Sequence, residues 1–218
     1  MKKHLLRIVG GDYRRTPIPV VDAEGLRPTP DRVRETLYNW LHHFWGGGFS
    51  DKRVLDLFAG TGALGFEAAS RGAAHVQMVE ANPEAVAALR QLRTRLGASQ
   101  VRIHAGDART VLARLNASPF DLVLLDPPFG LDWLDKLWPA LPALMAPDAL
   151  LYVESETPVA PPLAFEIVRQ GKAGAVHFHL LRFAASQKTG NNSTSESTQP
   201  GDQSGHHASE PSQQPEPE

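Results

Sequence analysis

The sequence predicts an α/β fold built on a mostly parallel sheet with helices on both faces. From Arg53 to about Phe183, short apolar runs alternate regularly with segments of helical periodicity, a pattern typical of parallel sheets whose two faces are covered. A glycine-rich turn follows the first apolar run, and acidic residues follow several others. Because ligands of such sheets bind beyond the carboxyl ends of the strands, we expect a three-layer α/β/α domain with a binding site at that edge.

Residues 1–48 precede this alternation and are predicted to form a hairpin followed by one helix. The runs 5–9 and 13–20 flank a turn at 10–12 and contain prolines suited to an edge. Thr29 is the predicted helix N-cap, with Pro30 at the first helical position. Five apolar residues then recur at helical spacing before three glycines end the helix: Val33, Leu37, Trp40, Leu41 and Phe44. We expect Arg32 and Arg34 to lie outside this apolar stripe.

Within the alternating part, the order of elements follows from the periodicity. Strands are expected at 54–57, 76–79, 101–103, 122–125, 150–153 and 175–183. Helices are expected at 66–70 and 83–96, in a short segment after residue 103, and in a Leu- and Trp-rich segment after residue 129. In the last strand, His177 and His179 are expected on a polar face rather than as a metal-binding pair.

Composition separates a polar tail from the rest of the chain. Residues 187–218 contain almost no aliphatic side chains, so this segment is predicted to be disordered. The expected organisation is therefore an extension (1–48), a catalytic domain (49–186) and a tail (187–218). The 218 residues include no cysteine, and no apolar run reaches membrane-spanning length. We therefore expect a cytoplasmic protein with no membrane association.

The formal net charge of −2 hides an uneven distribution. Residues 1–36 carry eight basic and five acidic side chains, whereas residues 187–218 carry one basic and five acidic side chains. The basic excess at the front of the chain is compatible with binding to an anionic polymer. An ordinary solvated surface can have the same distribution, so charge alone does not identify a partner.

A glycine-rich loop joins the first strand of the alternation to a helix. Gly60, Gly62 and Gly65 satisfy the pattern G-x-G-x-x-G, and Glu80 follows at the position of a ribose-binding acid. A dinucleotide, S-adenosylmethionine or a purely structural turn all fit this pattern. Asp56 at the strand end argues against a pyrophosphate, because it places a carboxylate near that anion. S-adenosylmethionine carries a sulfonium and an ammonium group, and both positive charges are favoured beside the same acid.

The fourth strand ends in Asp126-Pro127-Pro128-Phe129, which suits methylation of an aromatic amino group. The lone pair of such a nitrogen is delocalised into the ring, so two hydrogen-bond acceptors are needed to make it nucleophilic. Asp126 supplies a carboxylate, and the carbonyl of Pro127 is a plausible second acceptor in a stiffened backbone. Phe129 offers a flat face for a base turned out of its stack. The alternative is a proline turn with Phe129 in the core.

These two motifs, together with the front of the chain, resemble one known family. Asp-Leu-Phe-Ala-Gly-Thr-Gly after the first strand and Asp-Pro-Pro-Phe after the fourth look like those of amino-group nucleic-acid methyltransferases. The segments 7–11 (RIVGG) and 26–37 (LRPTPDRVRETL) resemble RsmD-type bacterial 16S rRNA guanine-N2 methyltransferases. The resemblance extends from about Leu5 to Phe183 and leaves the tail outside.

The resemblance implies a Rossmann-like, seven-stranded class I methyltransferase sheet with S-adenosylmethionine as cofactor. It implies catalysis at Asp126–Phe129 and methyl transfer to N2 of a guanine in 16S rRNA, guanine 966 of that RNA, within a small-subunit particle. An exposed loop aspartate is the alternative interpretation of Asp107. The residues expected to bind the donor are Asp56, Phe58, Ala59, Gly60, Thr61, Gly62, Glu80, Ala81, Asp107 and Ala108.

Six arginines are candidates for holding RNA phosphates: Arg7, Arg14, Arg15, Arg27, Arg32 and Arg34. We expect a monomer that uses no metal and forms no covalent enzyme intermediate. Two other functions remain open from the sequence alone. An adenine-N6 DNA methyltransferase needs the same acid, proline pair and aromatic residue, although no separate target-recognition domain is evident. The second open function is that of a non-catalytic assembly factor that retains a cavity for the donor.

Overall fold

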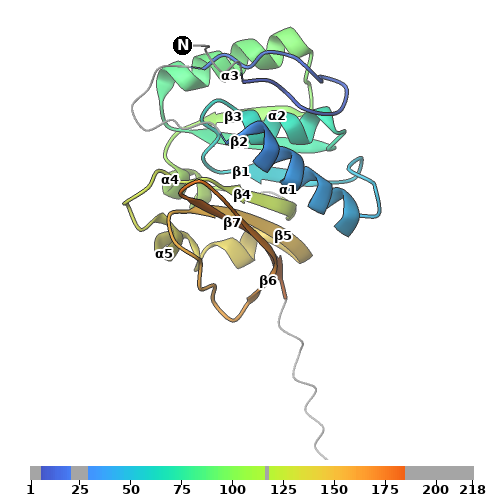
Figure 1. The fold of residues 1–218 in the computed structure, drawn as a ribbon. Coiled ribbons are helices and arrows are strands. Elements are labelled where there is room, and N and C mark those ends of the chain that lie inside the picture. Colours follow the sequence, from blue (N-terminus) through green and yellow to red (C-terminus); the bar gives the residue numbers. More distant parts are fainter. Residues whose placement is uncertain (1–5, 21–28, 116–117, 185–218) are drawn as a thin grey trace, which may run out of the picture. The chain divides into compact units, whose positions relative to one another are not determined.

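The computed structural model describes residues 6–20, 29–115 and 118–184 (Figure 1). The described residues all belong to one compact unit that spans residues 1–187. The predicted disordered tail and Arg27 lie outside the described residues. No helix in the described part of the chain is both long enough and apolar enough to span a membrane.

A seven-stranded sheet with the order β3-β2-β1-β4-β5-β7-β6 forms the centre of this unit. The first five strands pair in parallel, whereas β7 is antiparallel to both β5 and β6. The strand order reverses between β1 and β4, which lie side by side. This reversal is the point where ligands of open α/β sheets bind. The strands are β1 (Arg53–Asp56), β2 (His75–Glu80), β3 (Val101–Ala105), β4 (Phe120–Leu125), β5 (Met145–Ser155), β6 (Phe165–Ala173) and β7 (Val176–Phe183).

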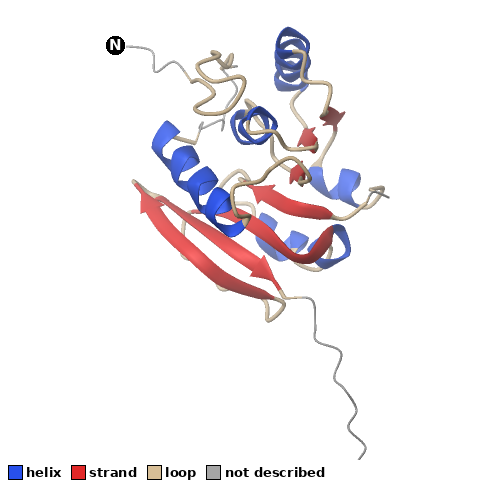
Figure 2. Cartoon of the chain, turned by 90° about the vertical axis from the view of Figure 1, so that its right-hand side faces the viewer, coloured by secondary structure: helices blue, strands red, loops and turns tan. Residues whose placement is uncertain are grey.

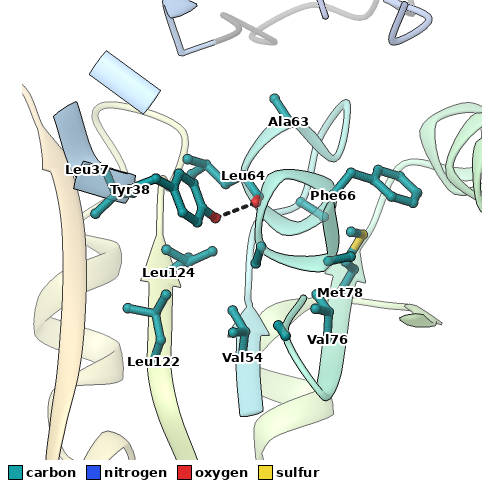
Figure 3. Close-up of a cluster of buried hydrophobic side chains, with 14 of the residues drawn as sticks. Leu37, Tyr38, Val54, Ala63, Leu64, Phe66, Val76, Met78, Leu122 and Leu124 are labelled. Carbon is teal, nitrogen blue, oxygen red and sulfur yellow. Dashed lines mark hydrogen bonds between the residues drawn. The ribbon is translucent and has the colours of Figure 1, made fainter. Parts of the chain in front are cut away.

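Helices lie on both sides of the sheet, as the side view shows (Figure 2). They are α1 (Asp31–Phe44), α2 (Ala63–Ser70), α3 (Pro83–Leu96), α4 (Ala108–Leu112) and α5 (Trp133–Leu137), with a 3-10 turn η1 (Leu141–Leu144). Alternate strand residues separate two cores. Val54, Leu122 and Leu124 pack with α1, α2 and α3 (Figure 3), whereas Leu55 and Val123 pack with α4, α5 and η1. The three-layer prediction is therefore confirmed.

Helix α3 coincides with its predicted range because both of its ends are encoded locally. The Asn82 side chain accepts hydrogen bonds from the backbone N–H groups of Glu84 and Ala85, and Pro83 opens the first turn. Gly97 ends the helix in the left-handed conformation (φ 62°), which costs glycine little.

Helix α1 begins as predicted, but the prediction that Thr29 caps it is wrong. Pro30 occupies the cap position without a side-chain hydrogen bond to the helix. The Thr29 hydroxyl instead bonds to the side chain of Glu154, 125 residues away in the sequence. A tertiary partner has therefore replaced the local cap.

The predicted N-terminal hairpin is short: among residues 6–20 its one antiparallel bridge pairs Arg7 with Pro17, and backbone hydrogen bonds join residues 6–8 to residues 15–18. The segment is also held by α2. The Glu67 carboxylate accepts hydrogen bonds from the backbone N–H groups of Val9 and Gly10 at 2.7 and 2.8 Å. A Cβ at Gly11 would lie 1.8 Å from the carbonyl oxygen of Ser70, so the chain passes α2 at a distance that only glycine permits.

Arg34 corrects a second prediction, because its side chain is fully buried rather than free to face a ligand. It lies on the same face of α1 as Tyr38 and Leu41, and its guanidinium contacts Asp31 at 2.6 Å and Glu67 at 3.6 Å. It also donates a hydrogen bond to the carbonyl oxygen of Arg7. Arg34 therefore joins the extension to α1 and α2 and is not exposed to a ligand.

Two features at the far edge of the sheet also differ from prediction. Strand β6 was not predicted, and it pairs only with β7. The side chain of His179 is buried (2% exposed), and its Nε2 lies 3.5 Å from the backbone nitrogen of Val159. The prediction that both histidines lie on a polar face is therefore correct only for His177, which is partly exposed.

Candidate active site

A cavity of about 470 Å³ opens at the carboxyl ends of the parallel strands. Its walls combine the loop after β1, the end of β2, the start of α4 and the loop after β4. Every predicted donor-binding or catalytic residue lines this cavity except Asp56 and Gly62. The sequence-predicted residues that line it are Phe58, Ala59, Gly60, Thr61, Glu80, Ala81, Asp107, Ala108, Asp126, Pro127, Pro128 and Phe129.

The glycine loop and Glu80 are bonded to each other. One Glu80 oxygen accepts a hydrogen bond from the backbone N–H of Gly60, and the other accepts one from the backbone N–H of Asn82, each at 2.7 Å. Gly60 has φ 52°, in the left-handed region that favours glycine. The carboxylate therefore holds the loop in place while facing the cavity.

Asp56 and Gly62 support the loop from behind the cavity wall. The Asp56 side chain is buried, and its Oδ2 accepts a hydrogen bond from the backbone N–H of Gly65 at 3.1 Å. A Cβ at Gly62 would lie 2.5 Å from Leu89. Neither residue lines the cavity, and the Asp56 side chain is directed toward α2, so their contact with the donor stays a prediction.

Burial and the nearby Glu80 charge raise the pKa of Asp56 to about 7, although the hydrogen bond from Gly65 opposes this. In the unfolded chain an aspartate ionises near pH 4, so between about pH 4 and 7 the folded protein binds the extra proton. Asp56 therefore stabilises the fold at low pH, and this contribution is lost as the pH rises through about 7.

We expect Asp56→Asn to flatten this part of the stability profile. Between pH 5 and pH 8 the Tm of the parent should fall more than that of the variant, because the asparagine cannot ionise. Thermal unfolding of both proteins across this range measures the difference. Parallel profiles would show that Asp56 ionises normally in the fold.

Asp107 follows β3 and caps the short helix α4. Its Oδ1 accepts a hydrogen bond from the backbone N–H of Thr110 at 3.1 Å, and the side chain is exposed at the cavity rim. It is thus an N-cap as well as a lining residue.

The loop after β4 forms the opposite wall. Pro127 is buried, whereas Asp126 and Phe129 are partly exposed toward the cavity. Trp133 also lines the cavity and packs edge-to-face against Phe58, with ring centroids 5.1 Å apart. The alternative interpretation, in which Phe129 belongs to the hydrophobic core, is therefore not supported.

A buried network behind Asp126 was missed by the sequence analysis. The Thr29 hydroxyl lies 2.9 Å from Glu154 Oε1 and 3.4 Å from Asp126 Oδ2. The Tyr152 hydroxyl donates to the same Glu154 oxygen at 2.9 Å. An acid directly after the predicted strand 150–153 was the available signal, since the carboxyl ends of parallel strands meet at one edge.

The carboxylates of Asp126 and Glu154 ionise with difficulty in this environment. Burial is the main cause that raises the pKa of Asp126 well above its usual value, and the charges of Glu154 and Asp56 add to it. Burial also raises the pKa of Glu154, while the hydroxyls of Tyr152 and Thr29 partly offset the effect.

The five predicted RNA-binding arginines that the structure describes do not line the cavity, and Arg27 lies outside the described residues. Arg7, Arg14, Arg15 and Arg32 are exposed on the extension and on α1. Within the part of the chain that the structure describes, no group of three or more metal-ligating side chains comes together.

Comparison with known proteins identifies the family. The sequence profile described as Conserved hypothetical protein 95 matches residues 6–182. Ribosomal RNA small subunit methyltransferase D of Escherichia coli is 38% identical over 182 residues, covering 81% of this chain and 89% of its own length. Its counterpart in Haemophilus influenzae is 35% identical, covering 81% and 93%. The chain belongs to the ribosomal RNA small subunit methyltransferase D family.

Solved structures of methyltransferases agree with this assignment. An Escherichia coli methyltransferase has a TM-score of 0.74 and 38% identity, covering 84% of this chain and 99% of its own. An RNA methyltransferase from Salinibacter ruber, solved with S-adenosyl-L-homocysteine, shares the fold at 18% identity (TM-score 0.56), covering 75% and 97%. The predicted class I methyltransferase fold and the resemblance to this family are thus confirmed.

Proposed function

We propose that the chain transfers a methyl group from S-adenosylmethionine to the exocyclic N2 of a guanine in 16S rRNA, guanine 966, within a small-subunit particle. The family relatives are named as small-subunit rRNA methyltransferases. The observation that carries the proposal is the meeting of the glycine loop and the Asp126–Phe129 segment in one cavity.

The charge of the cavity fits this donor. Glu80, Asp107 and Asp126 line it, and the lining residues that the structure describes include neither lysine nor arginine. Such a surface favours a ligand that carries a sulfonium and an ammonium group and disfavours a pyrophosphate. A volume of about 470 Å³ lies within the range of small-molecule sites.

We propose a place for each part of that donor from the chemistry of the lining residues. Glu80 is suited to accept hydrogen bonds from ribose hydroxyls, and the rim at Asp107 and Ala108 is suited to an adenine edge. Gly60, which has no side chain, lets the backbone approach the donor closely. When bound, the donor supplies an electrophilic methyl group on sulfur.

On the acceptor side, Asp126 and the Pro127 carbonyl accept hydrogen bonds from the protons of the target amino group. This draws the lone pair out of the ring and prepares the nitrogen for attack. Phe129 stacks on the flipped base, a contact that contributes about 1–3 kcal/mol. Catalysis rests on orientation and on acceptors matched to the positive charge that develops on nitrogen.

The exposed arginines of the extension provide the phosphate contacts. Arg7, Arg14, Arg15 and Arg32 are all available for an RNA strand, whereas Arg34 is not. Contacts of this kind give affinity that falls as salt concentration rises.

A methyl-transfer assay tests the proposal. Tritiated S-adenosylmethionine is supplied with small-subunit particles, naked 16S rRNA or duplex DNA, and the modified nucleoside is identified by mass spectrometry. We expect N2-methylguanosine at a single position in the ribosomal substrate and no label in DNA. N6-methyladenine in DNA would instead assign the chain to the alternative activity, and donor binding without transfer to any substrate would indicate a non-catalytic factor.

A further inference from the structure

The buried carboxyl of Glu154 has no place in the chemistry described so far, yet it is connected to Asp126 through one side chain. Thr29 enters from the extension, Asp126 follows β4, and Glu154 lies near the end of β5. Thr29 and Asp126 line the cavity, whereas Glu154 is 4% exposed and does not line it.

The hydrogen-bond distances define the connection. Thr29 Oγ1 lies 2.9 Å from Glu154 Oε1 and makes a longer contact of 3.4 Å with Asp126 Oδ2. A hydroxyl has one proton to donate and two lone pairs to accept with. When Thr29 donates to Glu154, its free lone pair can accept a proton from Asp126, so the three groups can conduct a proton in one direction.

We propose that Glu154 is a positioning residue that shares a proton with Asp126 through the Thr29 hydroxyl, so that Asp126 faces the target amino group as a carboxylate. This inference rests on the proposed function. The O–H bond of Asp126 breaks and its proton passes to Thr29 Oγ1, while the Thr29 proton passes to Glu154 Oε1. Asp126 becomes a carboxylate, Glu154 becomes the neutral acid, and no other reactant is needed.

The surroundings explain why the proton stays among Asp126, Thr29 and Glu154. Two neighbouring buried carboxyl groups do not ionise independently, because their charges repel in a poorly solvated site. The Tyr152 hydroxyl donates to Glu154 at 2.9 Å, which holds that carboxyl in place. Without such a partner, a buried Asp126 would have to exchange its proton with water in the cavity.

Among the described residues, two further titratable groups act on Asp126 or on Tyr152 beside Glu154. Asp56 from β1 acts on Asp126 by its charge, and Tyr38 from α1 acts on Tyr152. On β7, the residue paired with Glu154 is Phe178, which does not titrate. A change at Thr29 or Glu154 should therefore appear directly in the titration of Asp126.

Titration of the substrate-free protein tests the sharing without any RNA. The side-chain carboxyl carbons of labelled aspartate and glutamate are followed by NMR against pH, and Asp126→Asn and Glu154→Gln identify the two signals. Thr29→Val should raise the pH at which Asp126 ionises, because its carboxylate loses a hydroxyl donor. Glu154→Gln should also raise that pH, because the amide cannot take up the proton that Asp126 gives away, whereas simple repulsion between two carboxylates would lower it. We expect shifts of about one unit in this same direction.

Two controls separate this role from a general loss of structure. Thr29→Ser keeps the hydroxyl and should retain the parental titration, and Glu156→Gln, an exposed acid two residues beyond Glu154, should also leave it unchanged. Thermal unfolding checks that each variant is folded. If Asp126 titrates at the same pH in the parent, Thr29→Val and Glu154→Gln, the proposed sharing is overturned.

Activity provides the second readout. In both Thr29→Val and Glu154→Gln the acid limb of kcat against pH should move to higher pH, with the affinity for S-adenosylmethionine unchanged. A purely structural role would lower kcat at every pH without moving the limb. If the parent transfers no methyl group to ribosomal RNA, the proposed function fails, but the NMR titration still decides whether the proton is shared.

Discussion

Replacing Asp126 by alanine is expected to lower the kcat for methyl transfer by about 10²–10⁴-fold while leaving donor affinity almost unchanged. Asp126 faces the cavity from the loop after β4, whereas the proposed donor contacts come mainly from the loop after β1 and from Glu80. The variant removes the carboxylate that accepts the amino protons and leaves the donor wall intact. Single-turnover kinetics and calorimetry with S-adenosylmethionine measure the two quantities separately.

Asp135→Ala is a matched control for this experiment. Asp135 is an exposed aspartate on α5, nine residues after Asp126 in the sequence and outside the cavity lining. Its replacement should leave both kcat and donor affinity at parental values. Parental turnover in Asp126→Ala would refute the role given to the acid.

Glu67→Gln is expected to produce the largest loss of stability. The buried Glu67 carboxylate lies within 3.6 Å of the Arg34 guanidinium and 2.9 Å of Arg71 Nε. Removing one charge from a buried ion pair costs about 3–5 kcal/mol, and Arg34 would keep only the partly exposed Asp31 as a partner. This is a large part of the 5–15 kcal/mol or so that stabilises an ordinary domain. Urea unfolding measures the change.

The control for Glu67→Gln is Glu35→Gln, which neutralises an exposed acid on α1. A surface change of this kind should alter the free energy of unfolding by no more than about 0.5 kcal/mol. If both variants lose the same small amount, the buried cluster does not contribute to stability as its geometry indicates.

The parts of the fold that could be predicted from the sequence are those whose signals are local. Helix α3 carries its own cap at Asn82 and its own stop at Gly97. The buried parallel strands are continuous apolar runs, as expected when both faces are covered. The Asp126–Phe129 segment could be placed because its position follows directly from the end of such a run.

Other features depended on partners distant in the sequence. A charged residue on a helix is normally assigned to the surface, and Arg34 is buried because Glu67 from another helix neutralises it together with Asp31 from its own helix. The same holds for Thr29, whose partner Glu154 comes from the fifth strand. Strand β6 was missed because it pairs on one edge only and consists largely of exposed or half-buried residues, which weakens the apolar signal.

The position of Thr29 makes the extension part of the proposed catalytic centre and not an independent appendage. A shortened chain that began after residue 30 could keep the sheet and the donor wall, yet it would lack the hydroxyl between Asp126 and Glu154. Exchanging the first segment between two relatives should therefore succeed only when the incoming segment brings a hydroxyl to this place. Substrate recognition and proton handling would then have to change together during divergence of such enzymes.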